Sequence, residues 1–497
     1  MKDIAIIGGG ATGTATLIAL LKAISKQKQL LGIKITVFEP KEEMGLGLAY
    51  SAPLSSILLN TSVGSTTIVA GDNKHFANWL SKNESLWKPL FPEITSYNLE
   101  SFLPRSLCGL YIKETLKNAL SKQDPKRVVV QHVRQKVTGI KLSEQAEKPF
   151  TIFTTGGAHL SDGCVLATGY GQGYSHTYSY LSENKNYCAS PYLCFEQIKK
   201  ISPHEKVLIV GTGLSAIDAA LILKNHPNVT LTSRRGFIPA VRNRIIATEP
   251  KHLTEHFQEK FFKDNAHRLG IEQVRKEIEI ELSYRLNKKI VFNEIEINKN
   301  TVRQLREDIG AARKKNNSWE DSIFCILGFI DRAWGFLSLV DQKQLITHEM
   351  KLISRYISSF PFGNAKLFYE KIKSGSLTLR NNLSNIYIDG EKFRAEFYGK
   401  TAIETEQYDH VVNATPVDKY ITMLPGLYLN LIEHEIIQRN HFGGVLVSPQ
   451  CEIINAFKKL PFFAAGPITK GSFLITNLLA TSAKQAEIIA QLILNKP

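Results

Sequence analysis

The sequence contains few cysteines, and none of them belongs to a paired motif. Six cysteines are spread among 497 residues, with no CxxC arrangement. That arrangement is typical of zinc sites and of the redox-active dithiols of thioredoxin-reductase-like enzymes. We therefore expect no bound metal and no disulfide.

Long apolar runs are also absent. Every extended apolar stretch is interrupted by charge, glycine or proline, so none predicts a transmembrane helix. The apolar residues near the N-terminus lack a preceding basic region and meet three consecutive glycines, which does not fit a signal peptide. We expect a soluble cytoplasmic protein with no membrane-spanning segment.

The motifs of hydrolases and metalloenzymes are missing as well. We find no metal-ligand cluster, no acid–base dyad and no GxSxG frame, since Ser215 stands in "TGLSA". A sequence without conspicuous catalytic side chains suits an enzyme whose cofactor carries most of the reactivity.

Negative charge is scarce relative to positive charge. Lys and Arg number 61 and Asp and Glu number 46, for a formal net charge of +15. This excess could serve solubility, or attract NADPH, an acidic partner or an anionic membrane. No recognition motif accompanies it, so nucleic acid is not expected.

One feature occurs twice, at residues 4–14 ("IAIIGGGATGT") and 207–221 ("VLIVGTGLSAIDAAL"). Each segment is an apolar run fit for a buried strand, then a glycine turn, then a helical pattern. The first glycine makes the turn, the second lets a pyrophosphate approach the backbone, and the third allows close packing of helix and strand. The helix N-terminus then offers free N–H groups to phosphates, with Ser215 as a helix-start hydroxyl. The three places are held by Gly8, Gly10 and Gly13 in the first copy, and by Gly211, Gly213 and Ala216 in the second.

The two copies differ after the next strand. The first copy continues to "IKITVFEP", which ends in Glu39, and an acid there can bind the ribose hydroxyls of an adenine dinucleotide. The second continues to "NVTLTSRRGF", where Ser233, Arg234 and Arg235 stand instead; arginines there suit a 2′-phosphate. The pattern predicts FAD at the first turn and NADPH at the second. A bare turn without a ligand stays an alternative for each, more so for the second.

The organisation after each turn also repeats. Strand-like pieces "RVVVQHV", "KVTGIKL" and "PFTIFTT" precede "DGCVLATGYG", and "SLTLRN", "NIYIDG" and "FRAEFYG" precede "YDHVVNATP". We interpret each group as a β-meander that leads to a returning strand. This predicts an α/β flavoprotein with two Rossmann-like dinucleotide-binding domains of glutathione-reductase-like topology. Thr168 and Gly169 would lie at the crossing between domains, and Gly466 in the segment that returns to cover the flavin.

A stretch rich in Lys, Glu, Leu and Arg predicts a helical insertion in the second domain. It could be a packing or dimer element, or it could wall the substrate pocket between domains. The expected units are FAD-binding domain 1–185, NADPH-binding domain 186–250, helical insertion 251–372, the return of the NADPH domain 373–418, and the return of the FAD domain 419–497.

The pieces quoted above, together with "VFEPKEEMGLGLAYS", "LLNTS", "FLPRSLCGLYI" and "AAGPITKGSF", resemble a bacterial FAD/NAD(P)-binding protein family that includes FAD-dependent urate hydroxylase-like proteins. That family is similar in turn to lysine/ornithine N-hydroxylases and flavin-containing monooxygenases. The resemblance implies that Gly45, Gly47 and Tyr50 lie beside the FAD ribose and pyrophosphate, and that Arg105 faces the cofactor.

The resemblance also suggests two catalytic residues. Asn60 resembles the Asn of flavin-containing monooxygenases whose amide lies next to the isoalloxazine, although a helix or turn cap is the alternative. His176 is a candidate that could instead be a loop histidine. The residues that we assign to cofactor binding are Gly8, Gly10, Ala11, Thr12, Gly13, Glu39, Gly47, Tyr50, Asn60, Arg105, Val137, Thr168, Gly169, Gly211, Gly213, Ser215, Arg234, Arg235 and Gly466.

These observations predict an FAD-dependent oxidoreductase that NADPH reduces. We expect a monooxygenase that hydroxylates a small nitrogen-containing metabolite with molecular oxygen, through a flavin C4a-hydroperoxide. A reductase or dehydrogenase without oxygen chemistry and a non-catalytic FAD-binding protein are the alternatives.

Overall fold

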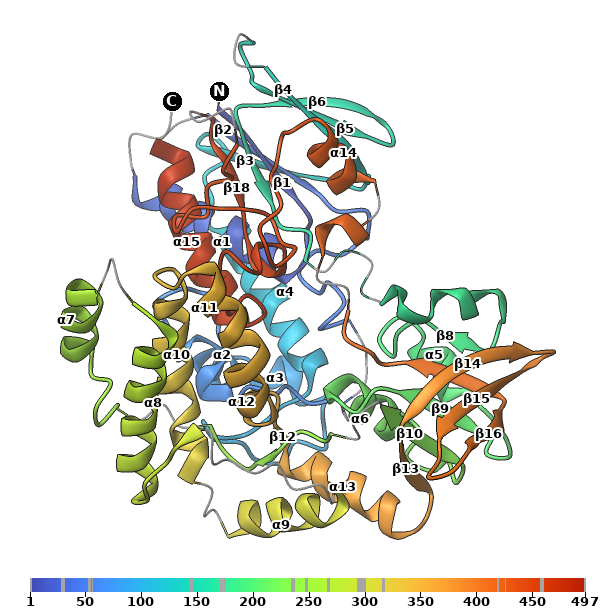
Figure 1. Cartoon of the computed structure of the whole chain (residues 1–497). Helices are drawn as coiled ribbons and strands as arrows, with labels where there is room; N and C mark the ends of the chain where they lie inside the picture. The colour runs from blue at the N-terminus through green and yellow to red at the C-terminus, as the bar shows by residue number, and fades with distance from the viewer. Residues whose placement is uncertain are drawn as a thin grey trace.

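The computed structural model contains two parallel sheets in separate lobes, joined by helices and loops (Figure 1). Helices α8 (Ile271–Leu286), α10 (Ile323–Trp334), α11 (Leu339–Gln344) and α12 (Met350–Ile357) lie beneath the lobe of the first sheet in this view. The structure describes residues 2–27, 32–51, 55, 57–143, 146–169, 171, 173, 175–233, 237–245, 249–265, 269–292, 301–314, 318–417, 420–424, 426–455 and 460–495.

The first sheet is built around the strand that precedes the first glycine turn. Ile4 pairs in parallel with Ile35 on one side and with Gly163 on the other. A nearly continuous apolar strand is what a parallel sheet buried on both faces requires. In sheet order, the strands are β18 (Phe462–Ala464), β7 (Gly163–Leu166), β1 (Lys2–Ile7), β2 (Ile33–Phe38) and β3 (Val128–Val133).

The second sheet repeats this arrangement strand for strand. Its central strand precedes the second glycine turn and pairs in parallel with the strands on both sides. The edge strand β18 of the first sheet comes from the C-terminal part of the chain, so that part of the chain lies in the first lobe. In sheet order, the strands are β8 (Tyr187–Cys188), β17 (His410–Asn413), β9 (Val207–Val210), β10 (Val229–Ser233) and β13 (Leu377–Asn381).

The predicted meanders are partly wrong. The pieces "RVVVQHV" and "SLTLRN" form β3 and β13, which add to the edges of the parallel sheets. A half-buried edge strand alternates in polarity as a meander strand does, so the pattern alone does not separate the two. The true antiparallel sheets consist of β4 (Val137–Leu142), β5 (Phe150–Thr154) and β6 (Gly157–Ser161), and of β14 (Leu383–Asp389), β15 (Lys392–Tyr398) and β16 (Ile403–Tyr408).

Helices α1 (Ala11–Lys26) and α15 (Leu479–Asn495) pack side by side in the first lobe (Figure 1). Their buried side chains, such as Leu20 and Ile489, share one core with the strands of the first sheet. Each fully buried side chain of this kind stabilises the fold by about 2 kcal/mol. This packing fixes the N-terminus of α1, and with it the first glycine turn.

The helical segment divides between two cores. Side chains of α9 (Thr301–Arg313) and α13 (Phe362–Lys373) join the core of the second sheet, and α13 directly precedes β13 in the chain. Side chains of α8 and α10 form another core together with Phe442 and Leu474 of the C-terminal part. In that contact the Trp334 indole donates to the Gly471 carbonyl at 2.8 Å, and Asp331 accepts from the Ile475 amide at 3.1 Å. The helical segment therefore contacts both lobes.

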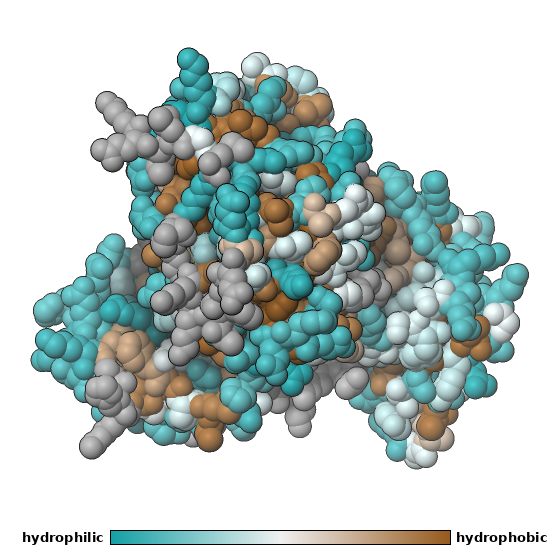
Figure 2. Space-filling view, turned by 90° about the horizontal axis from the view of Figure 1, so that it is seen from above, coloured by the Kyte–Doolittle hydropathy of each residue, from teal (hydrophilic) through white to brown (hydrophobic). Residues whose placement is uncertain are grey.

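None of the helices in the described ranges is long and apolar enough to cross a membrane. Seen from above, hydrophilic residues cover much of the surface and apolar residues form separate groups (Figure 2). The α-helices are α2 (His75–Lys82), α3 (Glu84–Trp87), α4 (Arg105–Ser121), α5 (Phe195–Lys199), α6 (Leu214–Ile222), α7 (Glu255–Asn265), α8 (Ile271–Leu286), α9 (Thr301–Arg313), α10 (Ile323–Trp334), α11 (Leu339–Gln344), α12 (Met350–Ile357), α13 (Phe362–Lys373) and α14 (Leu427–Glu433); the other elements are η1 (Val63–Ser65), η2 (His176–Glu183), η4 (Ser318–Asp321), the π-helix η5 (Leu345–Glu349), η6 (Ile421–Met423), η7 (Gly466–Thr469), β11 (Val241–Arg242) and β12 (Phe360–Pro361).

Candidate dinucleotide sites

The first glycine turn joins β1 to α1, and two of its glycines are required by the fold itself. Gly8 has a φ of +103°, and a Cβ there would lie 2.6 Å from the carbonyl oxygen of Ala167. A Cβ on Gly13 would lie 1.8 Å from the carbonyl oxygen of Gly8. Only glycine tolerates such a φ and such contacts. These two positions therefore let helix, turn and strand pack closely.

The second turn joins β9 to α6 with the same geometry. Gly211 has a φ of +130°, and its Cβ would lie 2.6 Å from the carbonyl oxygen of Ala414. The amides of Ala167 and Ala414 each donate at 2.8 Å to the last carbonyl of the central strand. The Ala-Thr ends of the two returning strands thus occupy equivalent places. Ala216, at the third position, is buried.

The middle glycines, Gly10 and Gly213, are not required by protein packing. Their φ values are −68° and −80°, which any residue adopts. A Cβ on Gly10 would meet Gly47 at an ordinary 3.5 Å, and one on Gly213 would meet nothing within 4 Å. Each is the N-cap of its helix without a side-chain cap, so the N–H groups of the first turn stay available. Both turns thus fit a phosphate that approaches the backbone.

Glu39 follows β2 and lies against the first turn. One carboxylate oxygen accepts from the Gly9 amide at 2.9 Å, and the other accepts from the Lys41 amide at 3.1 Å. A carboxylate can accept about four hydrogen bonds, so capacity for two ribose hydroxyls is left. Gly9 was absent from the sequence prediction, although its place between two assigned glycines could have indicated it.

Ser233 occupies the place in the second lobe that Glu39 occupies in the first. Its hydroxyl accepts from the Thr212 hydroxyl at 3.2 Å, and Thr212 corresponds to Gly9. A cavity of about 450 Å³ opens here, and its lining includes Ser233, Gly213 and Ser215. Arg234 and Arg235, which follow in the sequence, lie outside the described residues.

The loop after β2 closes over the first turn. The Gly45 amide donates to the Gly9 carbonyl at 2.7 Å, and Gly45 and Gly47 have φ values of +103° and +54°. Tyr50 lies further along this loop, where burial raises the pKa of its hydroxyl. The loop therefore lies against the first turn, and its place beside the FAD ribose and pyrophosphate remains a prediction. A Cβ on Gly47 would lie 3.8 Å from the Ala11 amide nitrogen, whereas the Thr12 hydroxyl lies 3.1 Å from the Ser482 hydroxyl of α15.

Two further assigned residues meet the first turn from distant parts of the chain. A Cβ on Gly466, which has a φ of +75°, would lie 2.5 Å from the Thr12 hydroxyl oxygen. The Thr168 backbone lies against Gly8, and its side chain hydrogen-bonds to the Tyr428 hydroxyl at 2.5 Å. Gly169 follows with a φ of +66° and open space around it. The fold therefore gathers these residues around the N-terminus of α1.

The Asn60 backbone is held by a buried arginine. Arg242 of β11 donates to the Asn60 carbonyl at 3.2 Å and to the carbonyls of Tyr356 and Ile357. Burial lowers the pKa of Arg242 to about 10. The N-cap of the neighbouring helix η1 is Ser62, so Asn60 is not its cap.

Arg105 reaches into the second lobe. Its guanidinium lies 3.6 Å from a carboxylate oxygen of Asp218 in α6 and 5.4 Å from the centre of the Tyr192 ring. The Tyr192 hydroxyl donates to the same Asp218 oxygen at 2.7 Å. Burial raises the pKa of Asp218, against the opposing effects of Arg105 and Tyr192. Sequence reasoning missed Asp218, although a carboxylate in an otherwise apolar helix was a visible signal.

His176 lies next to residues that line the cavity of the second lobe, and Val137 lies in a hydrophobic core. His176 is half-buried at the start of η2, and its neighbours Thr177 and Tyr178 line the cavity at the second turn. Val137 begins β4 and is buried in the core between the first sheet and the antiparallel sheet. Val137 therefore has a packing role here, and a role in cofactor binding remains a prediction.

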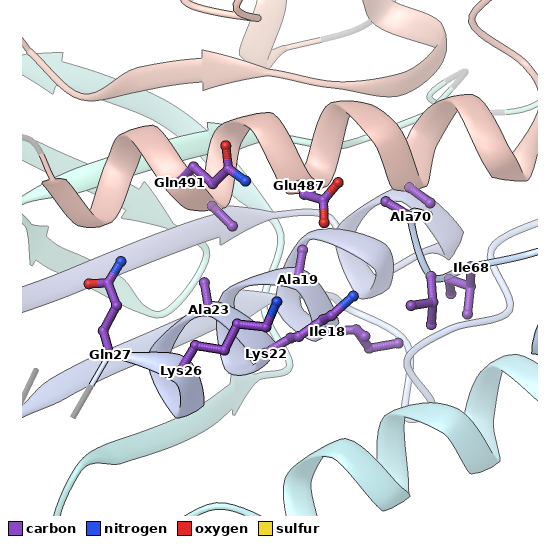
Figure 3. A pocket seen from close by; sticks show the side chains of 13 residues that line it. Ile18, Ala19, Lys22, Ala23, Lys26, Gln27, Ile68, Ala70, Glu487 and Gln491 are labelled. Carbon is purple, nitrogen blue, oxygen red and sulfur yellow. The ribbon is translucent and has the colours of Figure 1, made fainter. Parts of the chain in front are cut away.

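A second cavity, of about 190 Å³, lies along α1 and α15, away from the glycine turns (Figure 3). Ala19 and Ala23 form its floor, Lys22 and Lys26 lie along one side, and Glu487 projects from α15. Within the described residues, no group of three or more His, Cys, Asp or Glu side chains could hold a metal ion.

Comparison with known proteins gives a family match for the segment that contains the first glycine turn. Residues 5–171, which contain the first turn, Glu39 and Thr168, match a family model described as FAD-NAD(P)-binding. This segment is an FAD/NAD(P)-binding domain. The matched residues end a few residues after β7, the strand whose end the Gly8 turn packs against.

One curated relative, "Uncharacterized protein YdhS" of Escherichia coli (strain K12), is 27% identical over 289 residues. The match covers 51% of this chain and spans about half, 49%, of that protein's length.

Solved structures of two monooxygenases and a hydroxylase share the fold of the whole chain. L-lysine 6-monooxygenase from Pseudomonas syringae is 13% identical, with a TM-score of 0.57 and 100% of both chains covered. Ornithine hydroxylase (PvdA) from Pseudomonas aeruginosa is 16% identical, with a TM-score of 0.55 and coverage of 99% and 98%. The cadaverine monooxygenase DfoA from Erwinia amylovora, bound to FAD, is 13% identical, with a TM-score of 0.53 and coverage of 99% and 94%. The predicted fold class and the resemblance to N-hydroxylases are thereby confirmed at the level of fold.

Proposed function

We propose that the protein is an NADPH-dependent flavoprotein monooxygenase that hydroxylates a small nitrogen-containing metabolite. The observation that carries the proposal is the pair of equivalent turns with different residues at the ribose position, Glu39 in one and Ser233 in the other. Proteins of the same fold include an ornithine hydroxylase, an L-lysine 6-monooxygenase and a cadaverine monooxygenase. The amine substrates of these proteins support an amine substrate here.

FAD is assigned to the first turn. The uncapped N–H groups after Gly10 would bind the pyrophosphate, and Glu39 would accept hydrogen bonds from the ribose. The backbones of Thr168 and Gly466 would border the cofactor where they meet the start of α1. When bound, FAD supplies the redox chemistry, since it takes reducing equivalents from NADPH and passes them to oxygen.

NADPH is assigned to the second turn and its cavity of about 450 Å³. The N–H groups after Gly213 and the Ser215 hydroxyl would bind the pyrophosphate. Ser233 places no carboxylate where the 2′-phosphate would lie, and Arg234 and Arg235 would pair with that phosphate. Because residue 233 is not an acid, it cannot accept hydrogen bonds from the ribose of NADH as a carboxylate would, and NADH is therefore the weaker ligand.

Asn60 is assigned as an uncharged hydrogen-bond donor beside the flavin. Arg242 supports this role because its guanidinium donates to the Asn60 carbonyl and so ties the Asn60 backbone to β11, the strand that precedes α7. We further propose that the helical segment walls the substrate pocket, since it contacts the second sheet and the C-terminal part of the first lobe. The domain boundaries that we predicted would then assign 251–372 to substrate binding.

The test is NADPH-dependent oxygen uptake with lysine, ornithine or cadaverine as probe amines. We expect at least one small amine to yield a hydroxylated product in proportion to the NADPH consumed. NADPH oxidation without oxygen uptake, coupled to another electron acceptor, would contradict the proposal and favour a reductase. A protein that binds FAD and oxidises no NADPH would instead be a non-catalytic FAD-binding protein.

A further inference from the structure

One buried amide of the second lobe replaces an apolar side chain of the first. Asn413 ends β17 in the second sheet, at the place where Leu166 ends β7 in the first. Leu166 belongs to an apolar core, whereas Asn413 is a polar side chain that is only 2% exposed. Burial of an amide costs free energy unless the amide is hydrogen-bonded. The partners of Asn413 therefore indicate why this position is polar.

The Asn413 side chain uses its full hydrogen-bonding capacity. Its Nδ2 donates to the Ser175 carbonyl at 3.2 Å and to the Tyr187 hydroxyl at 3.0 Å. Its Oδ1 accepts from the Thr415 amide at 3.1 Å and from the Thr415 hydroxyl at 2.6 Å. Because a side-chain amide offers a pair of N–H donors and a pair of acceptor sites, none of them is left over.

Two of these partners lie on the segments by which the chain crosses between the lobes. The first crossing segment leads from β7 of the first sheet to β8 of the second, and it contains Ser175. The second leads from β17 to η6 and α14, and it contains Thr415. Side chains of η6 and α14, such as Ile421, share a core with those of β7, so this segment ends in the first lobe. Asn413 therefore holds both crossing segments to the second lobe.

The first lobe holds the same segments close to these contacts. A Cβ on Gly173 would lie 1.9 Å from a side-chain carbon of Leu48, in the loop that closes over the first turn. On the second crossing segment, the Ile421 amide donates to the Gly443 carbonyl at 2.8 Å. Each crossing is thus confined to the few residues between a contact of the first lobe and a contact of Asn413.

The crossing segments also border the cavity at the second turn. Thr415 lines that cavity, and so does Thr177, whose amide donates to the Ser175 hydroxyl at 3.2 Å. A nucleotide bound in the cavity would therefore lie against both crossing segments. Their position relative to Asn413 sets how the cavity faces the first lobe.

We propose that Asn413 is a positioning residue that clamps both crossing segments and sets the orientation of the second lobe relative to the first. The inference rests on the proposed function, in which a nicotinamide in the second lobe must meet a flavin in the first. A displacement of about 1 Å between reacting groups lowers a rate by about a hundredfold. Without the clamp, NADPH should still bind but should reduce the flavin slowly.

Amide hydrogen exchange of the full chain tests the clamp without any nucleotide. Asn413→Leu introduces the residue of the first lobe and removes every hydrogen bond of the amide at similar volume. We expect peptides that contain residues 175–177 and 414–416 to exchange at least about tenfold faster than in the wild type. Tyr187→Phe is the matched control, because it removes a hydrogen bond of Asn413 that involves neither crossing segment, and both peptides should be unchanged. Wild-type exchange in Asn413→Leu would overturn the proposal.

Anaerobic flavin reduction separates positioning from binding. In the FAD-loaded protein, Asn413→Leu should lower the limiting rate of flavin bleaching by NADPH at least about tenfold, whereas the Kd for NADPH should change less than about threefold. Tyr187→Phe should retain the wild-type rate. A wild-type limiting rate in folded Asn413→Leu would show that Asn413 is only a structural residue and would overturn the positioning role.

A second variant covers the case in which Asn413→Leu does not fold. Thr415→Val removes only the hydroxyl donor to Asn413, and both measurements should change in the same direction by a smaller factor. If neither changed in Thr415→Val, the proposal would be overturned. If NADPH does not bleach the flavin of the wild type, the proposed function fails instead, and hydrogen exchange still decides whether Asn413 clamps the crossing segments.

Discussion

Arg105 at the start of α4 lies 3.6 Å from Asp218 in α6, and this ion pair joins the two lobes. The Arg105 side chain also donates from Nε to the Leu58 carbonyl at 3.2 Å, two residues before Asn60. A buried link therefore runs from the helix of the second glycine turn to the segment that we assign to the flavin. The contribution of this buried ion pair to stability can be compared with that of an ion pair on the surface.

Asp218→Ala should destabilise the protein strongly. The substitution leaves Arg105 buried without its acid, which typically costs about 3–5 kcal/mol. The free energy of unfolding from chemical denaturation measures the effect. Glu84→Ala removes one partner of the exposed pair with Lys88 and should cost less than about 1 kcal/mol. Equal losses of unfolding free energy in the two variants would show that the buried pair contributes no more to stability than the exposed pair does.

Gly10→Ala should impair FAD binding while the fold persists. A Cβ at this position meets no close protein atom, but it would occupy the space where the pyrophosphate approaches. We expect FAD affinity to fall at least about tenfold, or 1.4 kcal/mol. Flavin content after dialysis and thermal unfolding of the flavin-free protein measure the two effects.

Gly8→Ala is the matched control for this prediction. Its φ of +103° and the contact with the Ala167 carbonyl should destabilise even the flavin-free protein, by at least about 1–3 kcal/mol. If Gly10→Ala lowered the unfolding temperature as much as Gly8→Ala while FAD affinity was retained, the assignment of the first turn would fail.

Ser233→Glu should reverse the nucleotide preference. The new carboxylate would stand where Glu39 stands in the first lobe, where it repels a 2′-phosphate and accepts hydrogen bonds from a ribose. We expect kcat/KM for NADPH to fall relative to NADH by at least about tenfold, which is 1.4 kcal/mol. Thr401→Glu places the same charge on an exposed turn of the second lobe and should leave the ratio unchanged. An unchanged ratio in Ser233→Glu would contradict the assignment of the second site.

Asn60→Asp should uncouple NADPH oxidation from hydroxylation. The substitution retains the size of the side chain but replaces a neutral donor by a carboxylate. Removal of one such donor from an active site typically costs about a hundredfold in rate. The ratio of product to hydrogen peroxide measures coupling, and the exposed Asn118→Asp is the control. If coupling is retained in Asn60→Asp, Asn60 has no role at the flavin.

The sequence was sufficient for the fold because its strongest signals are local. Gly8 and Gly211 each follow a buried strand and precede a helix, and the spacing alone predicts the turn that the structure contains. Glu39 and Ser233 were also found by counting one strand onward. These features need no knowledge of distant contacts.

Other features depend on contacts between distant segments, and the sequence could not supply them. Arg105 meets Asp218 from another lobe, so its own neighbours "LPRSLCG" reveal nothing about that partner. The helical pattern of residues 251–372 indicated apolar stripes, but not that α9 and α13 pack on the second sheet whereas α10 packs near Gly471. The strand β3 was mistaken for part of a meander because an edge strand has the same alternation.

The most direct test of the account is anaerobic mixing of the FAD-loaded protein with NADPH or with NADH, followed by the flavin absorbance. If the second turn is a working nicotinamide site, NADPH should bleach the flavin, and NADH should do so at least about tenfold more slowly at equal subsaturating concentrations. Failure of both nucleotides to bleach the flavin would contradict the central claim, because the second glycine turn would then deliver no reducing equivalents to the first site.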